Sequence, residues 1–344
     1  MIRTTVIGSQ PEFEIGILRT GLDTFECTHP GLDASAIKKE LTSQRKLNME
    51  HQLSTGLDIL AEGEIGRVDR HALGHAYVTY IGKFISGLSA PFHKMRGDDP
   101  PFIITGPLTQ LDPAIICDDW EQAQKLSNRP VKINLPGPLT FAMRFANLHH
   151  RRISECSYEF ACILNDQIQA LTKHGCRWIQ LDDPGLVSYP AAAHEFGLAH
   201  LNVAFRGTPK DTQQIVHLCR GNEYRLGGRV RHQLSEPYYA QYAEFFADSE
   251  ITGISIESPH EYCQNFHLKG FGTKDILLGI VDVNDDFPGE NQMISTIQTA
   301  LTEIPSHQLV ITPNCGIKHL SHKNAGKMLR SMVSAVEKVN SNLP

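Results

Sequence analysis

Residues 214–221 read Gln-Ile-Val-His-Leu-Cys-Arg-Gly (QIVHLCRG), an apolar run that ends on a histidine and a cysteine with one residue between them. Short β-rich runs of this kind recur along the chain and alternate with longer segments of helical periodicity. They lie at residues 4–8, 58–63, 131–137, 177–183, 214–221, 251–258, 276–283 and 308–316. The alternation predicts an α/β fold in which parallel strands are joined by crossover helices.

A single (β/α)8 TIM barrel is the fold that eight such strands predict. The chain has 344 residues, more than the roughly 250 of a typical barrel. The surplus includes residues 84–111, which are rich in Gly and Pro and which we expect to form a hairpin-like insertion between strands two and three. No low-complexity tract or linker divides the sequence, so we expect residues 1–344 to form one domain. A doubly wound open sheet is the alternative, because the same alternation of elements serves it.

Helical periodicity is clearest in four segments, and residues suited to N-cap positions precede two of them. The segments are residues 34–53, 237–247, 290–302 and 321–339. We expect Asp33 and Ser321 to be the N-caps.

Composition excludes several classes of protein. With 41% hydrophobic residues, a net charge of −6 and no long basic run, the chain does not have the electrostatics of a nucleic-acid-binding protein. It has no apolar run of the roughly 18 to 20 residues that a bilayer span needs, and its first residues lack the apolar core of a signal peptide. We therefore expect a cytoplasmic protein without membrane contact. The eight cysteines are scattered, which favours free thiols over a disulfide framework.

In a barrel, the residues that do chemistry lie where strands end and βα loops begin. Polar and metal-binding residue types occupy these positions repeatedly. They are Ser9, Glu64, Asp182, Asp183, His217, Cys219, Glu257, Asp282, Asn284 and Cys315.

His217 and Cys219 lie two residues apart at the end of one predicted strand. Because strand side chains alternate between faces, both point the same way and both can reach one ion. Zinc takes imidazole nitrogen and thiolate sulfur, and Glu257 and Cys315 at two other strand ends have the chemistry to complete its ligand set. A buried core His/Cys pair is the alternative that the spacing leaves open.

Seven short motifs, in order along the chain, resemble the catalytic half of the cobalamin-independent methionine synthase family. They are TTVIGSQP, GLDILAEGEIGR, LPGPLT, IQLDDPGL, HLCRGN, SIES and PNCG, and the resemblance runs from Thr4 to about Lys318. It implies a zinc-dependent methyltransferase on a (β/α)8 barrel that forms methionine by methylating homocysteine. By the same resemblance the zinc ligands are His217, Cys219, Glu257 and Cys315. The residues that hold the amino-acid part of homocysteine are Ile7, Gly8, Ser9, Glu64 and Asp182.

Several features depart from the family pattern. The N-terminal half of the long members, which helps to bind the folate tail, has no counterpart in this sequence. Arg144 stands where the family has a tryptophan near the folate, and Gly97, beside the matching Arg96, replaces a cysteine. Asn284 stands at the position of the family's proton-donating histidine and cannot supply a proton, although a buried Asp282 could take that role. We therefore expect a methyl donor other than methyltetrahydrofolate polyglutamate, such as a methylated corrinoid or a carrier protein.

Three other functions remain open from the sequence. The first is a zinc-dependent alkyltransferase that acts on another thiol such as coenzyme M, although Glu64 and Asp182 favour a thiol with an ammonium group. The second is a zinc hydrolase with Asp183 as the base for a metal-bound water, a role less suited to a zinc with two thiolate ligands. The third is a barrel that stores zinc without catalysis.

Overall fold

A computed structural model gives the structure of the protein. It describes residues 1–11, 34–65, 67, 85–89, 102–110, 114–150, 152–219, 238–257, 267–283 and 288–343. The expected N-cap Asp33 and the residues Arg96, Gly97 and Asn284 lie outside these ranges.

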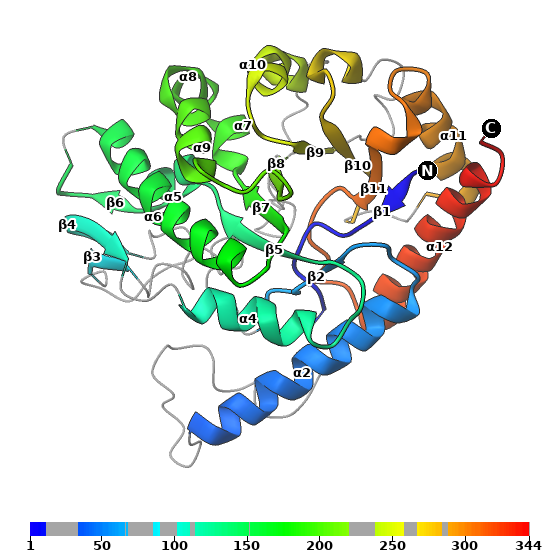
Figure 1. The fold of residues 1–344 in the computed structure, drawn as a ribbon, viewed down its shortest axis with the longest axis horizontal. Coiled ribbons are helices and arrows are strands. Elements are labelled where there is room, and N and C mark those ends of the chain that lie inside the picture. Colours follow the sequence, from blue (N-terminus) through cyan, green and yellow to red (C-terminus); the bar gives the residue numbers. More distant parts are fainter. Residues whose placement is uncertain are drawn as a thin grey trace.

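Eight parallel strands form the central sheet, as the sequence predicts (Figure 1). Their order in the sheet is β1-β11-β10-β9-β8-β7-β5-β2. The two ends of the sheet meet where the Ile59 N–H donates to the Thr4 carbonyl at 3.0 Å, so the barrel closes. The strands are β1 (Arg3–Thr4), β2 (Leu60–Ala61), β5 (Val131–Pro136), β7 (Trp178–Asp182), β8 (Gln213–Leu218), β9 (Gly253–Glu257), β10 (Asp275–Val281) and β11 (Leu309–Pro313).

Helices surround the barrel and bury their apolar faces against the outer sides of the strands (Figure 1). The longer ones are α2 (Ala34–Ser54), α4 (Ala114–Gln124), α6 (Ile153–Lys173), α9 (Leu198–Phe205), α11 (Glu290–Leu301) and α12 (His322–Asn340). The shorter ones are α5 (Pro138–Arg144), α7 (Pro184–Ser188), α8 (Pro190–Ala192), α10 (Ala243–Asp248), a π-helix at Ala193–Gly197, and 3-10 turns at Tyr238–Tyr242, Leu268–Phe271 and Ser306–Gln308. The described helices include none that is long and apolar enough to cross a membrane.

The helix predictions are close to the observed bounds. Three of the four segments begin and end within one residue of the prediction, whereas the segment predicted at 237–247 is divided between a 3-10 turn and α10. Ser321 is the N-cap of α12, because its side chain accepts a hydrogen bond from the Asn324 N–H at 3.2 Å.

The insertion between the second and third barrel strands contains a hairpin-like pair, as expected. β3 (Ile85–Ser89) pairs with β4 (Ile103–Gln110) in antiparallel fashion, and β6 (Ala146–Asn147) adds a short parallel edge to β4. This small sheet is separate from the barrel strands.

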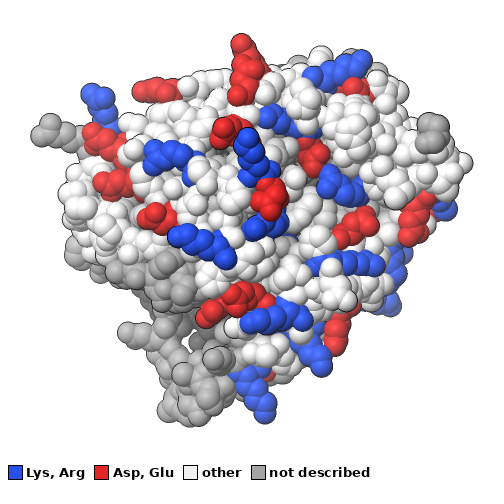
Figure 2. All heavy atoms as spheres, viewed as in Figure 1, with Lys and Arg blue, Asp and Glu red and all other residues white. Residues whose placement is uncertain are grey.

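Two apolar layers stabilise the barrel. The larger lies between the strands and the helices, where Phe141 and Phe160 stack with their centroids 4.4 Å apart. The smaller lies inside the barrel and consists of Ile59, Ile215, Leu277 and Val310, with Trp178 against them. On the face shown in Figure 2, basic and acidic side chains are interspersed.

A buried ion pair links the loop after β2 to β5. The Arg67 guanidinium lies 3.0 Å from the Glu62 carboxylate and donates to the Asn134 carbonyl at 2.8 Å, and both charged side chains are almost inaccessible to solvent. Truncating one partner of such a pair leaves an uncompensated buried charge.

We expect Arg67→Met to lower the free energy of unfolding by about 3–5 kcal/mol, because Glu62 would lose its cation in the interior. Urea denaturation measures this change. The matched control is Lys46→Met, which breaks the exposed 3.9 Å pair with Glu50 and should have little effect. Equal losses in the two variants would contradict the assigned role of the buried pair.

Candidate metal centre

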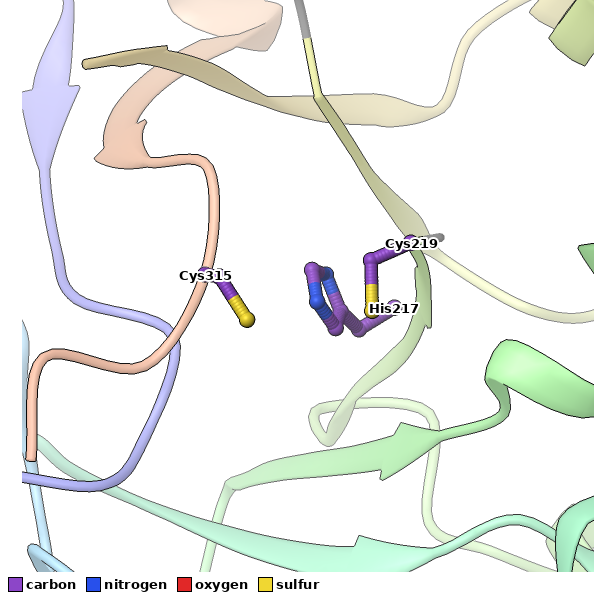
Figure 3. Close-up of side chains that lie close together, drawn as sticks. All are labelled: His217, Cys219 and Cys315. Carbon is purple, nitrogen blue, oxygen red and sulfur yellow. The ribbon is translucent and has the colours of Figure 1, made fainter. Parts of the chain in front are cut away.

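Three of the predicted metal ligands converge at one end of the barrel (Figure 3). His217 lies on β8, Cys219 follows the last residue of that strand, and Cys315 lies in the loop after β11. Their ligand atoms all lie within 4.8 Å of one another. His217 and Cys219 are 2% and 6% exposed, so the group is largely shielded from bulk water.

The His217 ring is held in a way that suits a metal ligand. Its Nδ1 makes a hydrogen bond with the Ser255 hydroxyl on the neighbouring strand β9 at 2.9 Å. Its Nε2 is buried and has no hydrogen-bond partner among the described residues. Metal-bound histidines commonly use one nitrogen for the ion and the other for a partner of this kind. The free Nε2 and two nearby sulfur atoms therefore fit a zinc ion.

Cys315 has the character of a thiolate. A hydrogen bond from Cys219 and the adjacent His217 imidazole lower the pKa of the Cys315 thiol to about 6, against the opposing effects of burial and of Glu257. The thiolate is the form that binds metals, so this cysteine is prepared for coordination at neutral pH.

Glu257 lies beside the three residues but outside the group that they form. It ends β9, is buried, and its Oε1 accepts a hydrogen bond from the Tyr239 hydroxyl at 3.1 Å. Its charge acts on the Cys315 thiol, which places the carboxylate near the centre. The structure thus brings three of the four predicted ligands together and leaves the fourth next to them.

The residues predicted to hold an amino acid lie against the same centre. Gly8 packs so closely on Glu64 that an added Cβ atom would lie 2.6 Å from Glu64 Oε1. Gly316 packs in the same way on Ser9, where an added Cβ atom would lie 2.1 Å from Ser9 Oγ. The Ile317 N–H also donates to the Ser9 carbonyl at 2.9 Å. The loop that carries Cys315 therefore packs directly on the loop after β1.

Asp182 lies one strand away from the metal ligands. It pairs in register with His217, and its two carboxylate oxygens accept hydrogen bonds from the Gln180 amide at 2.5 Å and the Asn134 amide at 3.0 Å. The Asn134 amide also donates to the Ile7 carbonyl at 2.7 Å. Ile7 and Asp182 are therefore joined through one side chain.

Glu64 adopts a left-handed backbone conformation with φ of 56°, unusual for a residue other than glycine. Burial raises the pKa of its carboxyl to about 7, and the nearby charges of Asp182 and Glu62 add to the rise, while Arg67 and Lys318 oppose it. Strained backbone and a raised pKa are typical of binding and catalytic sites.

Asp183 has a structural role. Both of its oxygens are engaged at the start of α5, where they accept the Leu139 N–H at 3.2 Å, the Thr140 N–H at 2.8 Å and the Thr140 hydroxyl at 2.6 Å. Burial raises the pKa of this carboxyl to about 6, although the hydrogen bonds with Thr140 and Leu139 oppose the rise. A carboxylate so occupied does not support the hydrolase alternative, which needs Asp183 as a base.

Several site residues were missed in the sequence. They are Lys132, Asn134, Gln180, Tyr239 and Ser255. All of them except Tyr239 are strand residues that face into the barrel. Because residues two apart on a strand share a face, the predicted strand-end residues Asp182 and Glu257 would have indicated Gln180 and Ser255. The roles of the two tentative catalytic residues, Asp282 and Asn284, stay predictions, and Asn284 lies outside the described residues.

Comparison with known proteins points to one family. Residues 2–338 match the family model described as the catalytic domain of the cobalamin-independent synthase. A methionine synthase of Pyrococcus furiosus is 24% identical, and the alignment covers all of this chain and 94% of that protein. A methionine synthase of Thermococcus kodakarensis is also 24% identical over 86% of this chain and 81% of the relative.

Longer relatives match over only part of their length. The 5-methyltetrahydropteroyltriglutamate–homocysteine methyltransferase of Streptomyces griseus is 24% identical, and the alignment covers all of this chain but 43% of that protein. Among solved structures, a B12-independent methionine synthase from Shewanella, in complex with selenomethionine, superposes with a TM-score of 0.80 at 22% identity, covering 99% of this chain and 98% of that one. This likeness confirms the barrel fold.

The raised pKa of Glu64 has a consequence for stability. The folded protein holds the proton of the Glu64 carboxyl more tightly than the unfolded chain does. The protonated carboxyl therefore makes its full contribution to the free energy of unfolding below pH 4.5, and this contribution is lost as the pH rises through about 7. As the pH rises from 5 to 8.5, we expect the free energy of unfolding of the wild type to fall by about 1–3 kcal/mol relative to that of Glu64→Gln. Chemical denaturation across this range, with Glu50→Gln on α2 as control, measures the difference. Parallel curves for wild type and Glu64→Gln would contradict the raised pKa.

Proposed function

Because the chain belongs to the cobalamin-independent synthase family, we propose that it is a zinc-dependent methyltransferase that forms methionine from homocysteine. The observation that carries the proposal is the convergence of His217, Cys219 and Cys315 beside the Glu64 and Asp182 carboxylates. A thiol-binding centre and an acceptor for an ammonium group lie one strand apart, which suits a small amino acid with a thiol.

The proposed zinc ligands are His217, Cys219, Cys315 and Glu257. A zinc ion held there would lower the pKa of a bound thiol, so that homocysteine is present as a nucleophilic thiolate. Glu257 lies next to the other three and makes a hydrogen bond with Tyr239. We propose that, with a zinc ion held there, Glu257 would be the ligand that is exchanged for the substrate sulfur.

The remaining residues of the site orient the amino acid. Glu64 and Asp182 receive the ammonium group, and Ser9 with the backbone of Ile7 and Gly8 receives the carboxylate. The thiolate sulfur then attacks the methyl carbon, a sulfur–carbon bond forms, and the donor leaves with the electron pair of its former bond to the methyl group. Asp282 is the proposed proton source for that leaving group, and Asn284 is a proposed hydrogen-bond partner for it.

The donor expected from the sequence, a methylated corrinoid or a carrier protein, gains no support from the comparisons. The family is described as cobalamin-independent. The longer relatives are named for 5-methyltetrahydropteroyltriglutamate. Arg144, the residue at the family's tryptophan position, is exposed at the end of α5. We propose methyltetrahydropteroyltriglutamate as the first donor to assay and methylcobalamin as the second.

Coenzyme M is the alternative acceptor. It carries a sulfonate and has no ammonium group, so Glu64 and Asp182 would receive no cation from the bound thiol. Buried or half-buried carboxylates left without a cation disfavour such a ligand. The two carboxylates therefore favour homocysteine.

We expect Cys315→Ala to lower zinc affinity by about 100-fold or more, since it removes a ligand rather than one of the supporting groups that cost about 10–100-fold. Methionine formation from homocysteine should fall in parallel. Zinc content after dialysis and product formation with each donor measure the two effects.

The matched control is Cys176→Ala, which alters another buried cysteine whose thiol has its pKa raised to about 12 by burial. That variant should keep both zinc and activity. Retention of zinc by Cys315→Ala would contradict the ligand assignment, and transfer to coenzyme M but not to homocysteine would contradict the proposed acceptor.

A further inference from the structure

A lysine lies inside the barrel beneath the carboxylate site. Lys132 on β5 is completely buried, and its ammonium group donates to the Val6 carbonyl at 2.7 Å and makes a short hydrogen bond to Gln180 Oε1. Burial lowers the pKa of this lysine to about 7, while Asp182 and Glu64 favour the charged form. None of the described carboxylates lies within salt-bridge distance of it.

The contact with Lys132 supports one orientation of the Gln180 amide. An ammonium group can only donate hydrogen bonds, so it requires the carbonyl oxygen of the Gln180 side chain. The amide nitrogen must then face the other way. There it donates to Asp182 Oδ1 at 2.5 Å and to the Ile7 carbonyl at 3.2 Å.

A second amide completes the arrangement. Asn134, two residues after Lys132 on the same strand, donates to Asp182 Oδ2 at 3.0 Å and to the Ile7 carbonyl at 2.7 Å. Each carboxylate oxygen of Asp182 is thus fixed by one amide, and both amides also hold Ile7 in the loop after β1. Lys132 stabilises the orientation of the Gln180 amide from the side opposite to Asp182.

We propose that Lys132 is a positioning residue for the amino-acid acceptor: through Gln180 it holds the Asp182 carboxylate in the orientation that receives the substrate ammonium group. The inference rests on the proposed function, because it takes the acceptor to be an amino acid. Lys132 does not touch the substrate, and its effect reaches the site only through the Gln180 amide and through its positive charge.

Two thiols separate this role from a general structural one. Homocysteine and 4-mercaptobutyrate share the thiol, the chain length and the carboxylate, and differ in the amino group. For Lys132→Met in the zinc-loaded enzyme we expect the dissociation constant of homocysteine to rise about tenfold, while that of 4-mercaptobutyrate changes less than about twofold. The turnover number at saturating homocysteine should change little, because the reacting atoms are not affected.

A double-variant cycle tests the route through Asp182. If Lys132 acts on binding through that carboxylate, Lys132→Met should add little to the loss of homocysteine affinity already caused by Asp182→Asn. Gln180→Glu is the second variant, since it keeps an oxygen partner for Lys132 but removes the N–H that Asp182 accepts. It should show the same selective loss, and it provides the test if Lys132→Met fails to fold.

The outcomes are distinct. Equal weakening of both thiols, or additive losses in the cycle, would overturn the positioning role of Lys132 while leaving the proposed function intact. If the wild-type enzyme itself binds homocysteine no more tightly than 4-mercaptobutyrate, the amino-acid acceptor is wrong and the role of Lys132 fails with it. Selective loss for homocysteine in both variants supports the proposal.

Discussion

The register between neighbouring barrel strands is the constraint on which the site depends. Asp182 on β7 lies beside His217 on β8, and His217 lies beside Ser255 on β9. All three point into the barrel because side chains alternate along a strand. A shift of one residue in either pairing would turn the metal ligand or its hydrogen-bond partner toward the helices, and the centre would be lost.

Below this polar layer, the barrel interior is apolar, with Ile59, Ile215, Leu277 and Val310 packed together. The change from apolar to polar residues along the same inward face gives the site an apolar floor. Charged groups placed at that boundary are shielded from water, which explains the raised pKa of Glu64 and the lowered pKa of Lys132. The fold therefore supplies both the positions of the ligands and the electrostatic conditions around them.

Much of this arrangement could be predicted from the sequence. The eight strands, the hairpin-like insertion and the Ser321 cap follow from local patterns, and the barrel places His217, Cys219 and Cys315 at one end. Local patterns do not determine which oxygen or nitrogen meets which partner. Asp182 and Asp183 are adjacent in sequence, yet one faces the site and the other caps α5. Lys132 gave no signal, because a lysine in a strand is usually exposed and its partners lie on β7 and in the segment after β1.

The central claim is that the converging histidine and cysteines hold a zinc ion that binds the acceptor thiol. Zinc-edge X-ray absorption of the zinc-loaded protein, with and without homocysteine, tests it most directly. We expect one additional sulfur in the zinc shell when homocysteine is present, in exchange for a light-atom ligand. A zinc shell that is unchanged by homocysteine would contradict the proposed binding of the acceptor at zinc, because the thiol would then bind away from the metal or not at all.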